Sequence, residues 1–257
     1  MKKISKQTGE VRKSESPEGP LRRRAFLQYT GAGIAASAFA LAGCEDATQE
    51  PSDINKANAG KNDNGSTRTT DDDTVYLGSG DTGLLNYAYA LEQLEAAFYT
   101  MVVADASFGS LFSENEKTIL QDLQKHEVSH REFFKVALGD NAIRALTPDF
   151  SAVNFSNRDS VLSVAKTFED LGVAAYNGAG KLLSDVNLLL VAGKIVSVEA
   201  RHAAAIRDVI NPWSTDFAGD DVIDENGLDK ALMPSDVLAA AQPFIKDKID
   251  GSELPTS

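Results

Sequence analysis

The sequence predicts an all-α protein, a four-helix bundle with one long crossover followed by a short C-terminal helical extension. Three observations support this class. Two Glu-x-x-His words, Glu127–His130 and Glu199–His202, recur 72 residues apart in a chain that has only three histidines. Four long stretches with helical apolar periodicity lie between about 80 and 210. A gapless internal repeat relates two of those stretches.

The first two helices are expected over about 82–103 and 113–138. Each carries leucine and phenylalanine at the three- and four-residue spacing that makes one apolar face. Ser113 and Glu116 have the spacing of a capping box, so the second helix should begin there. Gly139 is suited to end that helix, because glycine readily adopts the left-handed conformation found after a last turn.

The third and fourth helices are expected over about 159–183 and 186–210, and Pro212 lies just beyond the fourth. The short links within each helix pair favour antiparallel neighbours. The link over 140–157 is longer and contains Pro148. Fully extended, such a link spans about 55 Å, whereas a 25-residue helix is about 38 Å long. The link can therefore cross the whole bundle.

The internal repeat aligns Leu91–Tyr99 (LEQLEAAFY) with Phe168–Tyr176 (FEDLGVAAY). Glu92 falls on Glu169, and the order along the chain becomes Glu, Glu-x-x-His, Glu, Glu-x-x-His. Each acidic position lies in the middle of an apolar helical stripe, where a lone carboxylate is costly to bury. Four such carboxylates, two of them one turn from a histidine, therefore call for bound cations.

The repeat also singles out residues near these carboxylates. Tyr99 and Tyr176 each lie two turns after a glutamate, and we interpret them as catalytic phenols that hydrogen-bond a ligand or pass an electron, or as core aromatics. Glu95 lies on the inner face as well, but its counterpart is Gly172. We therefore expect Glu95 to support the ligands or substitute for one of them.

One motif supports a competing interpretation. His126-Glu127-Val-Ser-His130 has the H-E-x-x-H form of zinc metalloproteases, in which both histidines bind zinc and Glu127 is the general base. This interpretation leaves the other glutamates and His202 without a role. The extended form is also absent, because Phe133 and Val136 stand where it requires glycine and histidine. His126 is instead expected at the edge of its helix, beside the ligands.

The first 43 residues predict an export signal rather than part of the fold. Arg23-Arg24-Ala-Phe-Leu resembles a twin-arginine motif, and an apolar stretch then ends in Leu-Ala-Gly-Cys44, which resembles a lipobox. Cys44, the only cysteine, is expected to be the lipidated first residue of an envelope lipoprotein that faces the periplasm or exterior. An uncleaved membrane anchor is the alternative.

Residues 44–79 are polar and predict a flexible tether. Removal of 1–43 would take away eight Lys/Arg and three Glu, which changes the net charge from −13 to −18. A protein this acidic is not expected to bind nucleic acid through its phosphates.

The sequence beyond the fourth helix, 212–257, predicts an acidic loop and a helix within about 235–246. Trp213 is expected to pack on the end of the bundle, and Arg201 and Arg207 are expected as solvated or paired surface charges.

The words LEQLEAAFY, HEVSH, FEDLGVAAY and VEARH resemble the ferritin-like superfamily. More specifically, the chain is similar to exported bacterial ferritin-like-domain proteins that are related to plant desiccation-related proteins. The resemblance covers about 80–210. It implies two metal ions, with Glu127 and Glu199 as bridges, and the mixed oxygen and imidazole donors suit iron or manganese. The implied ligands are Glu92, Glu127, His130, Glu169, Glu199 and His202.

The resemblance implies a di-iron oxidoreductase of ferroxidase or peroxidase type, whose partners are metal ions and O2 or peroxide. The alternative is a non-enzymatic stress or desiccation protein in which the metals only hold the bundle together. A homodimer is compatible with either.

Overall fold

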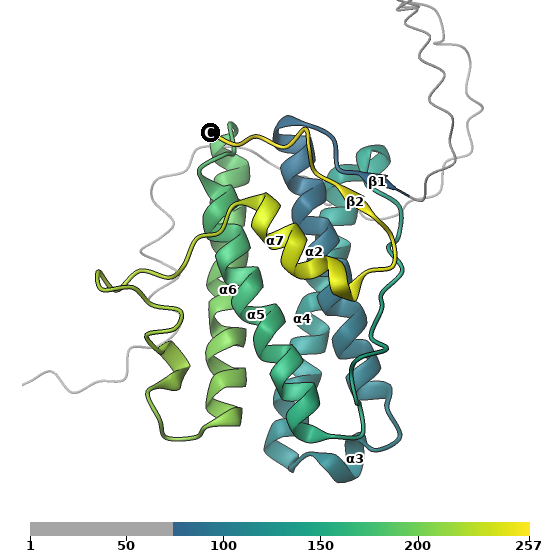
Figure 1. Ribbon diagram of the computed structural model, residues 1–257, viewed down its shortest axis with the longest axis vertical. Coiled ribbons are helices and arrows are strands. Elements are labelled where there is room, and N and C mark those ends of the chain that lie inside the picture. The colour runs from purple at the N-terminus through teal and green to yellow at the C-terminus, as the bar shows by residue number, and fades with distance from the viewer. Residues whose placement is uncertain (1–73) are drawn as a thin grey trace, which may run out of the picture. The chain divides into compact units, whose positions relative to one another are not determined.

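The computed structural model describes residues 74–257, and the expected signal segment and Cys44 lie outside them. Four long helices form the bundle: α2 (Gly80–Ala104), α4 (Glu114–Leu138), α5 (Arg158–Gly180) and α6 (Val186–Ile210) (Figure 1). The pairs α2–α4 and α5–α6 make the most extensive contacts. The predicted all-α bundle is thus confirmed, with helix ends within a few residues of those expected.

The helix ends follow from local sequence. The Ser113 side chain accepts a hydrogen bond from the Glu116 amide, and the Glu116 carboxylate accepts one from the Ser113 amide. The same carboxylate accepts two hydrogen bonds from Arg158, which joins the start of α4 to the start of α5. Gly139 ends α4 with a φ of 53°, in the region that favours glycine. A short helix, α3 (Phe108–Leu111), connects α2 to α4.

The long link between α4 and α5 begins with the 3-10 turn η1 (Gly139–Asn141) and then runs along α2. Two buried amides of α2 hold its backbone. Asn86 accepts from the Ile143 amide at 3.0 Å, and Gln93, two turns later, accepts from the Leu146 amide at 2.9 Å. The link therefore crosses the bundle, as its length predicts.

The C-terminal extension comprises η2 (Asp216–Ala218), α7 (Pro234–Ala241), η3 (Gln242–Phe244) and β2 (Ile249–Asp250). Helix α7 lies across α5 (Figure 1). Strand β2 pairs in parallel with β1 (Val75–Tyr76), and Val75 and Leu77 are buried. Residues 75–77 of the segment predicted as a tether are thus packed, because β1 has a partner strand far along the chain.

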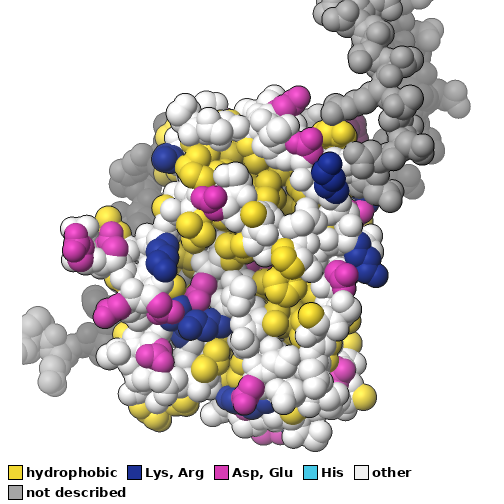
Figure 2. All heavy atoms as spheres, viewed as in Figure 1, with side chains coloured by type: hydrophobic (Ala, Val, Ile, Leu, Met, Phe, Trp, Pro, Cys, Tyr) yellow, Lys and Arg dark blue, Asp and Glu magenta, His cyan; other side chains and the backbone are white. Residues whose placement is uncertain are grey.

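The surface mixes charge types. Figure 2 shows acidic and basic side chains scattered around a hydrophobic strip that runs down the face drawn, and no histidine of the described part is visible there. Trp213 does not pack on the bundle end as expected, since it is fully exposed. Its φ of 64° places it in the left-handed region directly after α6, where the chain reverses direction.

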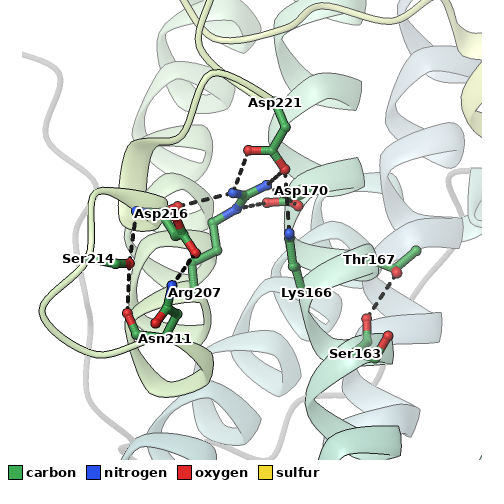
Figure 3. Close-up of polar contacts among 9 residues, drawn as sticks. All are labelled: Ser163, Lys166, Thr167, Asp170, Arg207, Asn211, Ser214, Asp216 and Asp221. Carbon is green, nitrogen blue, oxygen red and sulfur yellow. Dashed lines mark hydrogen bonds and ion pairs between the residues drawn. The ribbon is translucent and has the colours of Figure 1, made fainter.

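Arg207 is also not a surface charge, because it is only 3% exposed. It lies at the centre of a cluster that joins α5, α6 and the loop after α6 (Figure 3). Its guanidinium donates two hydrogen bonds to Asp170, two to Asp221 and one to the Asp216 carbonyl, at 2.7–3.0 Å. An arginine has five N–H donors, so every donor of Arg207 is matched. We call these four residues the Arg207 cluster.

Candidate metal centre

The six ligands implied by the sequence converge in the bundle interior. Each helix supplies one glutamate from the middle of its apolar stripe, and α4 and α6 each add a histidine one turn later. The four glutamates are completely buried, and His202 is 3% exposed. Their donor atoms form two groups, in each of which all atoms lie within 4.8 Å of one another. The groups are Glu92, Glu127, His130 and Glu199, and Glu127, Glu169, Glu199 and His202.

The two groups are built alike. In the first, His130 Nδ1 lies 2.9 Å from Glu199, 3.4 Å from Glu92 and 3.5 Å from Glu127. In the second, His202 Nδ1 lies 2.7 Å from Glu127 and 3.5 Å from both Glu169 and Glu199. Only Glu127 and Glu199 belong to both groups, which is the position of carboxylates that bridge two metal ions.

These close contacts are not hydrogen bonds, although their distances alone would allow ion pairs. Nδ1 of His130 and Nδ1 of His202 make no hydrogen bond to the carboxylate oxygens around them. Eight buried atoms of the six ligands therefore have no hydrogen-bond partner among the described residues. They are Nδ1 of His130 and His202, both carboxylate oxygens of Glu127 and Glu199, and one oxygen each of Glu92 and Glu169.

Two tyrosines explain why Glu92 and Glu169 each have only one unpaired oxygen. The hydroxyl of Tyr99, on α2, donates to Glu169 on α5 at 2.5 Å. The hydroxyl of Tyr176, on α5, donates to Glu92 on α2. These contacts cross between the two copies of the repeat, because each tyrosine donates to the glutamate of the other copy. Each tyrosine leaves one carboxylate oxygen free to face the centre.

The unpaired atoms fit two divalent cations. Unmatched carboxylates buried in a protein interior each cost several kcal/mol, and cations that they coordinate remove this cost. Two carboxylates with both oxygens free suit bridging positions, whereas two with one free oxygen suit terminal positions. One imidazole for each cation completes a mixed set of oxygen and nitrogen donors.

The pKa shifts show which of the buried ligand side chains hold a proton when no cation is bound. Burial raises the pKa of Glu169 to about 8, although the nearby imidazole of His202 acts in the opposite direction. For His130, burial is outweighed by Glu127, Glu199 and Glu92, which raise its pKa to about 12. For Glu127, burial is likewise outweighed by the two imidazoles, which lower its pKa to about 2. Metal binding must therefore displace protons from the centre.

Glu95 is buried, but its carboxylate belongs to neither group of donor atoms. Burial raises its pKa well above the usual range, and the neighbouring carboxylates add to this shift. A Cβ at Gly172 would lie 3.1 Å from Glu95 Oε1 and 3.8 Å from Glu199 Oε2. The repeat therefore lacks a side chain at 172 because the Glu95 carboxylate occupies that space.

His126 lies beside the centre and not in it. It is exposed, and its Nδ1 is 2.9 Å from Nε2 of buried His202. The ring centroids are 5.1 Å apart and the rings nearly parallel, so the nitrogen edges, not the ring faces, meet. His202 can thus present Nδ1 to a metal while Nε2–H donates to His126, an arrangement common for metal-bound histidine.

The same geometry argues against the zinc metalloprotease motif. Its two histidines should bind one zinc ion, but His126 contacts His202 while His130 faces three glutamates. The sequence did not predict the contact between His126 and His202, which depends on how α4 packs on α6. The available signal was the spacing of His126 and His130, which places both on one side of α4.

None of the helices in the described range 74–257 is long and apolar enough to cross a membrane. A search of curated proteins finds no match to the chain. Residues 80–212, slightly more than half of the sequence, match the family described as Ferritin-like domain. This match covers the four long helices and all six ligands implied by the sequence. The chain that carries this buried carboxylate and histidine centre therefore belongs to the ferritin-like domain family.

Proposed function

We propose that the protein binds two iron ions in this centre and oxidises ferrous iron with dioxygen or peroxide. The observation that carries the proposal is the set of eight buried donor atoms without partners, divided into two groups that share Glu127 and Glu199. Manganese is the other metal that this set suits. Bound metal ions would supply Lewis acidity and one-electron redox chemistry at positions still open to a small oxidant.

Each residue has a distinct part in this proposal. Glu92 and His130 would hold one ion, Glu169 and His202 would hold the other, and Glu127 and Glu199 would contribute to both positions. Tyr99 and Tyr176 fix the terminal carboxylates in orientation by holding one oxygen of each. The reaction balances when two ferrous ions give two electrons, which with two protons reduce one dioxygen to hydrogen peroxide or one hydrogen peroxide to two waters.

The decisive experiment measures metal content and oxidation on the same sample. Purified protein loaded anaerobically with ferrous iron should bind two ions per chain and change its near-ultraviolet absorbance when O2 or peroxide is added. Two bound ions without oxidation would favour the non-enzymatic stress or desiccation role. A stable bundle that binds no metal would contradict the di-metal centre itself.

We also infer that the protein is exported by the twin-arginine route and anchored to the cell envelope by a lipid on Cys44. Support comes from the paired arginines at 23 and 24 and from Leu-Ala-Gly-Cys44 after an apolar stretch. Cys44→Ser should release soluble protein or leave an uncleaved precursor. A variant that fractionates and migrates like the wild type would instead indicate an ordinary membrane anchor.

A further inference from the structure

An apolar pocket lies at one end of the bundle, where α2 and α6 begin and α4 and α5 end. All four long helices contribute to its wall. Leucine, alanine, valine, glycine, phenylalanine and tyrosine make up the lining, which includes no charged residue. Phe133 lies at the surface, 44% exposed, and lines the pocket as well, so it marks the mouth.

The pocket is suited to apolar contents. Its cavity is about 60 Å³, enough for a few water-sized molecules, but a buried water needs two to four polar partners. Two tyrosine hydroxyls are the only polar side-chain groups among the lining residues. The hydroxyl of Tyr176 is occupied by Glu92, which leaves only that of Tyr87. A pocket of this composition offers water few hydrogen-bond partners and favours small apolar molecules.

The pocket adjoins the metal centre. The ring of Tyr176 lies in the wall while its hydroxyl holds Glu92. Leu91 in the wall directly precedes Glu92, and Phe134 lies one turn after His130. The pocket wall and the ligand set are therefore in contact through the Tyr176 side chain.

We propose that this pocket binds dioxygen and admits it to the metal centre. The inference rests on the proposed function, in which the centre uses a small oxidant. Dioxygen is apolar and partitions into an apolar cavity, whereas hydrogen peroxide and ferrous ions are strongly hydrated and need a polar route. Exposed His126, hydrogen-bonded to His202, lies on such a polar side of the centre. The two oxidants thus reach the centre by different routes.

Xenon tests the pocket without the metals, because it is an apolar probe of similar size to dioxygen. Crystals of the metal-free protein under xenon pressure should show xenon between Ala88, Tyr176 and Ala192. The variant Ala192→Leu places a larger side chain in the wall and should exclude it. The matched control is Ala204→Leu on the same helix, which lines a different cavity and should leave xenon bound. Absence of xenon from the wild-type pocket would overturn the proposal.

The kinetics of iron oxidation test whether dioxygen reaches the metal centre through the pocket. In iron-loaded protein, Ala192→Leu should raise the dioxygen concentration for half-maximal oxidation several-fold, with the rate under hydrogen peroxide unchanged. Leu188→Ala, which widens the same wall, should lower that concentration, so the test survives if the first variant folds poorly. If both variants alter xenon binding but not the dioxygen dependence, the route is wrong. If wild-type protein binds no iron, the proposed function and the route fail together, while the xenon result still shows what the pocket binds.

Discussion

The metal centre and the Arg207 cluster both place charged residues on α5 and α6, yet they are completed differently. Glu169 and Asp170 are neighbours on α5, and His202 and Arg207 lie five residues apart on α6. In the Arg207 cluster, every guanidinium donor has an acceptor within the protein. In the metal centre, eight donor atoms have no partner among the described residues.

This difference shows that buried charged residues can serve either to stabilise the fold or to bind a ligand. A cluster that satisfies itself stabilises the fold, because no group is left unpaired in the interior. A cluster that leaves its atoms unpaired costs stability until something outside the chain binds it. Substitutions at the two adjacent acidic residues should therefore have opposite consequences.

The largest effect is expected at Glu169. Glu169→Gln keeps an oxygen for Tyr99 but removes the charge that a cation needs, so the protein should bind fewer than two metal ions. The stability of the metal-free protein should hardly change, because the raised pKa of Glu169, about 8, already favours its neutral form at pH 7. Elemental analysis after iron loading would measure the metal content, and urea unfolding in chelator would measure the stability of the metal-free protein. Two ions bound with wild-type affinity would remove Glu169 from the ligand set.

The second-largest effect is expected at Asp170, the residue that follows Glu169 on α5. Asp170→Asn removes the carboxylate that accepts two hydrogen bonds from Arg207, at 2.7 and 2.8 Å. Charge-assisted hydrogen bonds contribute about 1.5–3 kcal/mol each, and the Asp170 side chain is 21% exposed, so the free energy of unfolding should fall by about 2 kcal/mol. Metal stoichiometry should stay at two ions. Urea unfolding measures the loss, and normal stability with lost metal would reverse our assignment of the two clusters.

The two clusters should also respond oppositely to pH. In metal-free protein, burial raises the pKa of Glu169 from 4.5 to about 8, and nearby carboxylates raise that of His202 from 6.5 to about 12. The stabilisation that each shift gives the folded protein is fully present below the pKa of the group in the unfolded chain. It is lost as pH rises through the pKa of the same group in the folded protein. The hydrogen bonds from Arg207 lower the pKa of Asp221 below 3.8, so its contribution is lost only as pH falls below that value.

The free energy of unfolding of metal-free protein should therefore decrease from about pH 5 to pH 9. Urea titrations in chelator across this range would measure the slope, and Glu169→Gln should reduce it. A stability that increases over the same range would contradict the assigned shifts.

The smallest effect is expected at His126. His126→Ala removes the hydrogen-bond partner of His202 Nε2 but no ligand, so two metal ions should still bind. Loss of such an outer partner weakens metal binding by about 10- to 100-fold. Competition with a chelator would measure the change, and His126→Gln should restore part of the affinity. His202→Ala is the comparison and should lower the stoichiometry. The reverse pattern would favour the zinc metalloprotease motif.

Local patterns were enough to predict the helices and to nominate the ligands. Apolar periodicity and the capping box at Ser113 depend on residues close in sequence, and the Glu-x-x-His spacing fixes which side chains share a face. The convergence of the six nominated side chains is a property of the structure that periodicity alone could not establish.

Contacts between distant segments could not be read from the sequence. Arg207 is buried because residues 216–221 fold back onto α6, and nothing near Arg207 in sequence indicates this. The exchange of tyrosines between repeats, the contact of His126 with His202 and the exposure of Trp213 likewise depend on tertiary packing.

The pairing of β1 with β2 has a consequence for the order of folding. Val75 pairs with Ile249 and Tyr76 with Asp250, so residues that emerge from the ribosome before the bundle are completed by residues that emerge after it. The four helices can form and pack during synthesis, but β1 must wait for β2. Contacts this distant along the chain form late, after the loops between them have closed. The pairing of β1 with β2 can therefore be present only after residues 249–250 have been synthesised, whereas the four helices can pack before that.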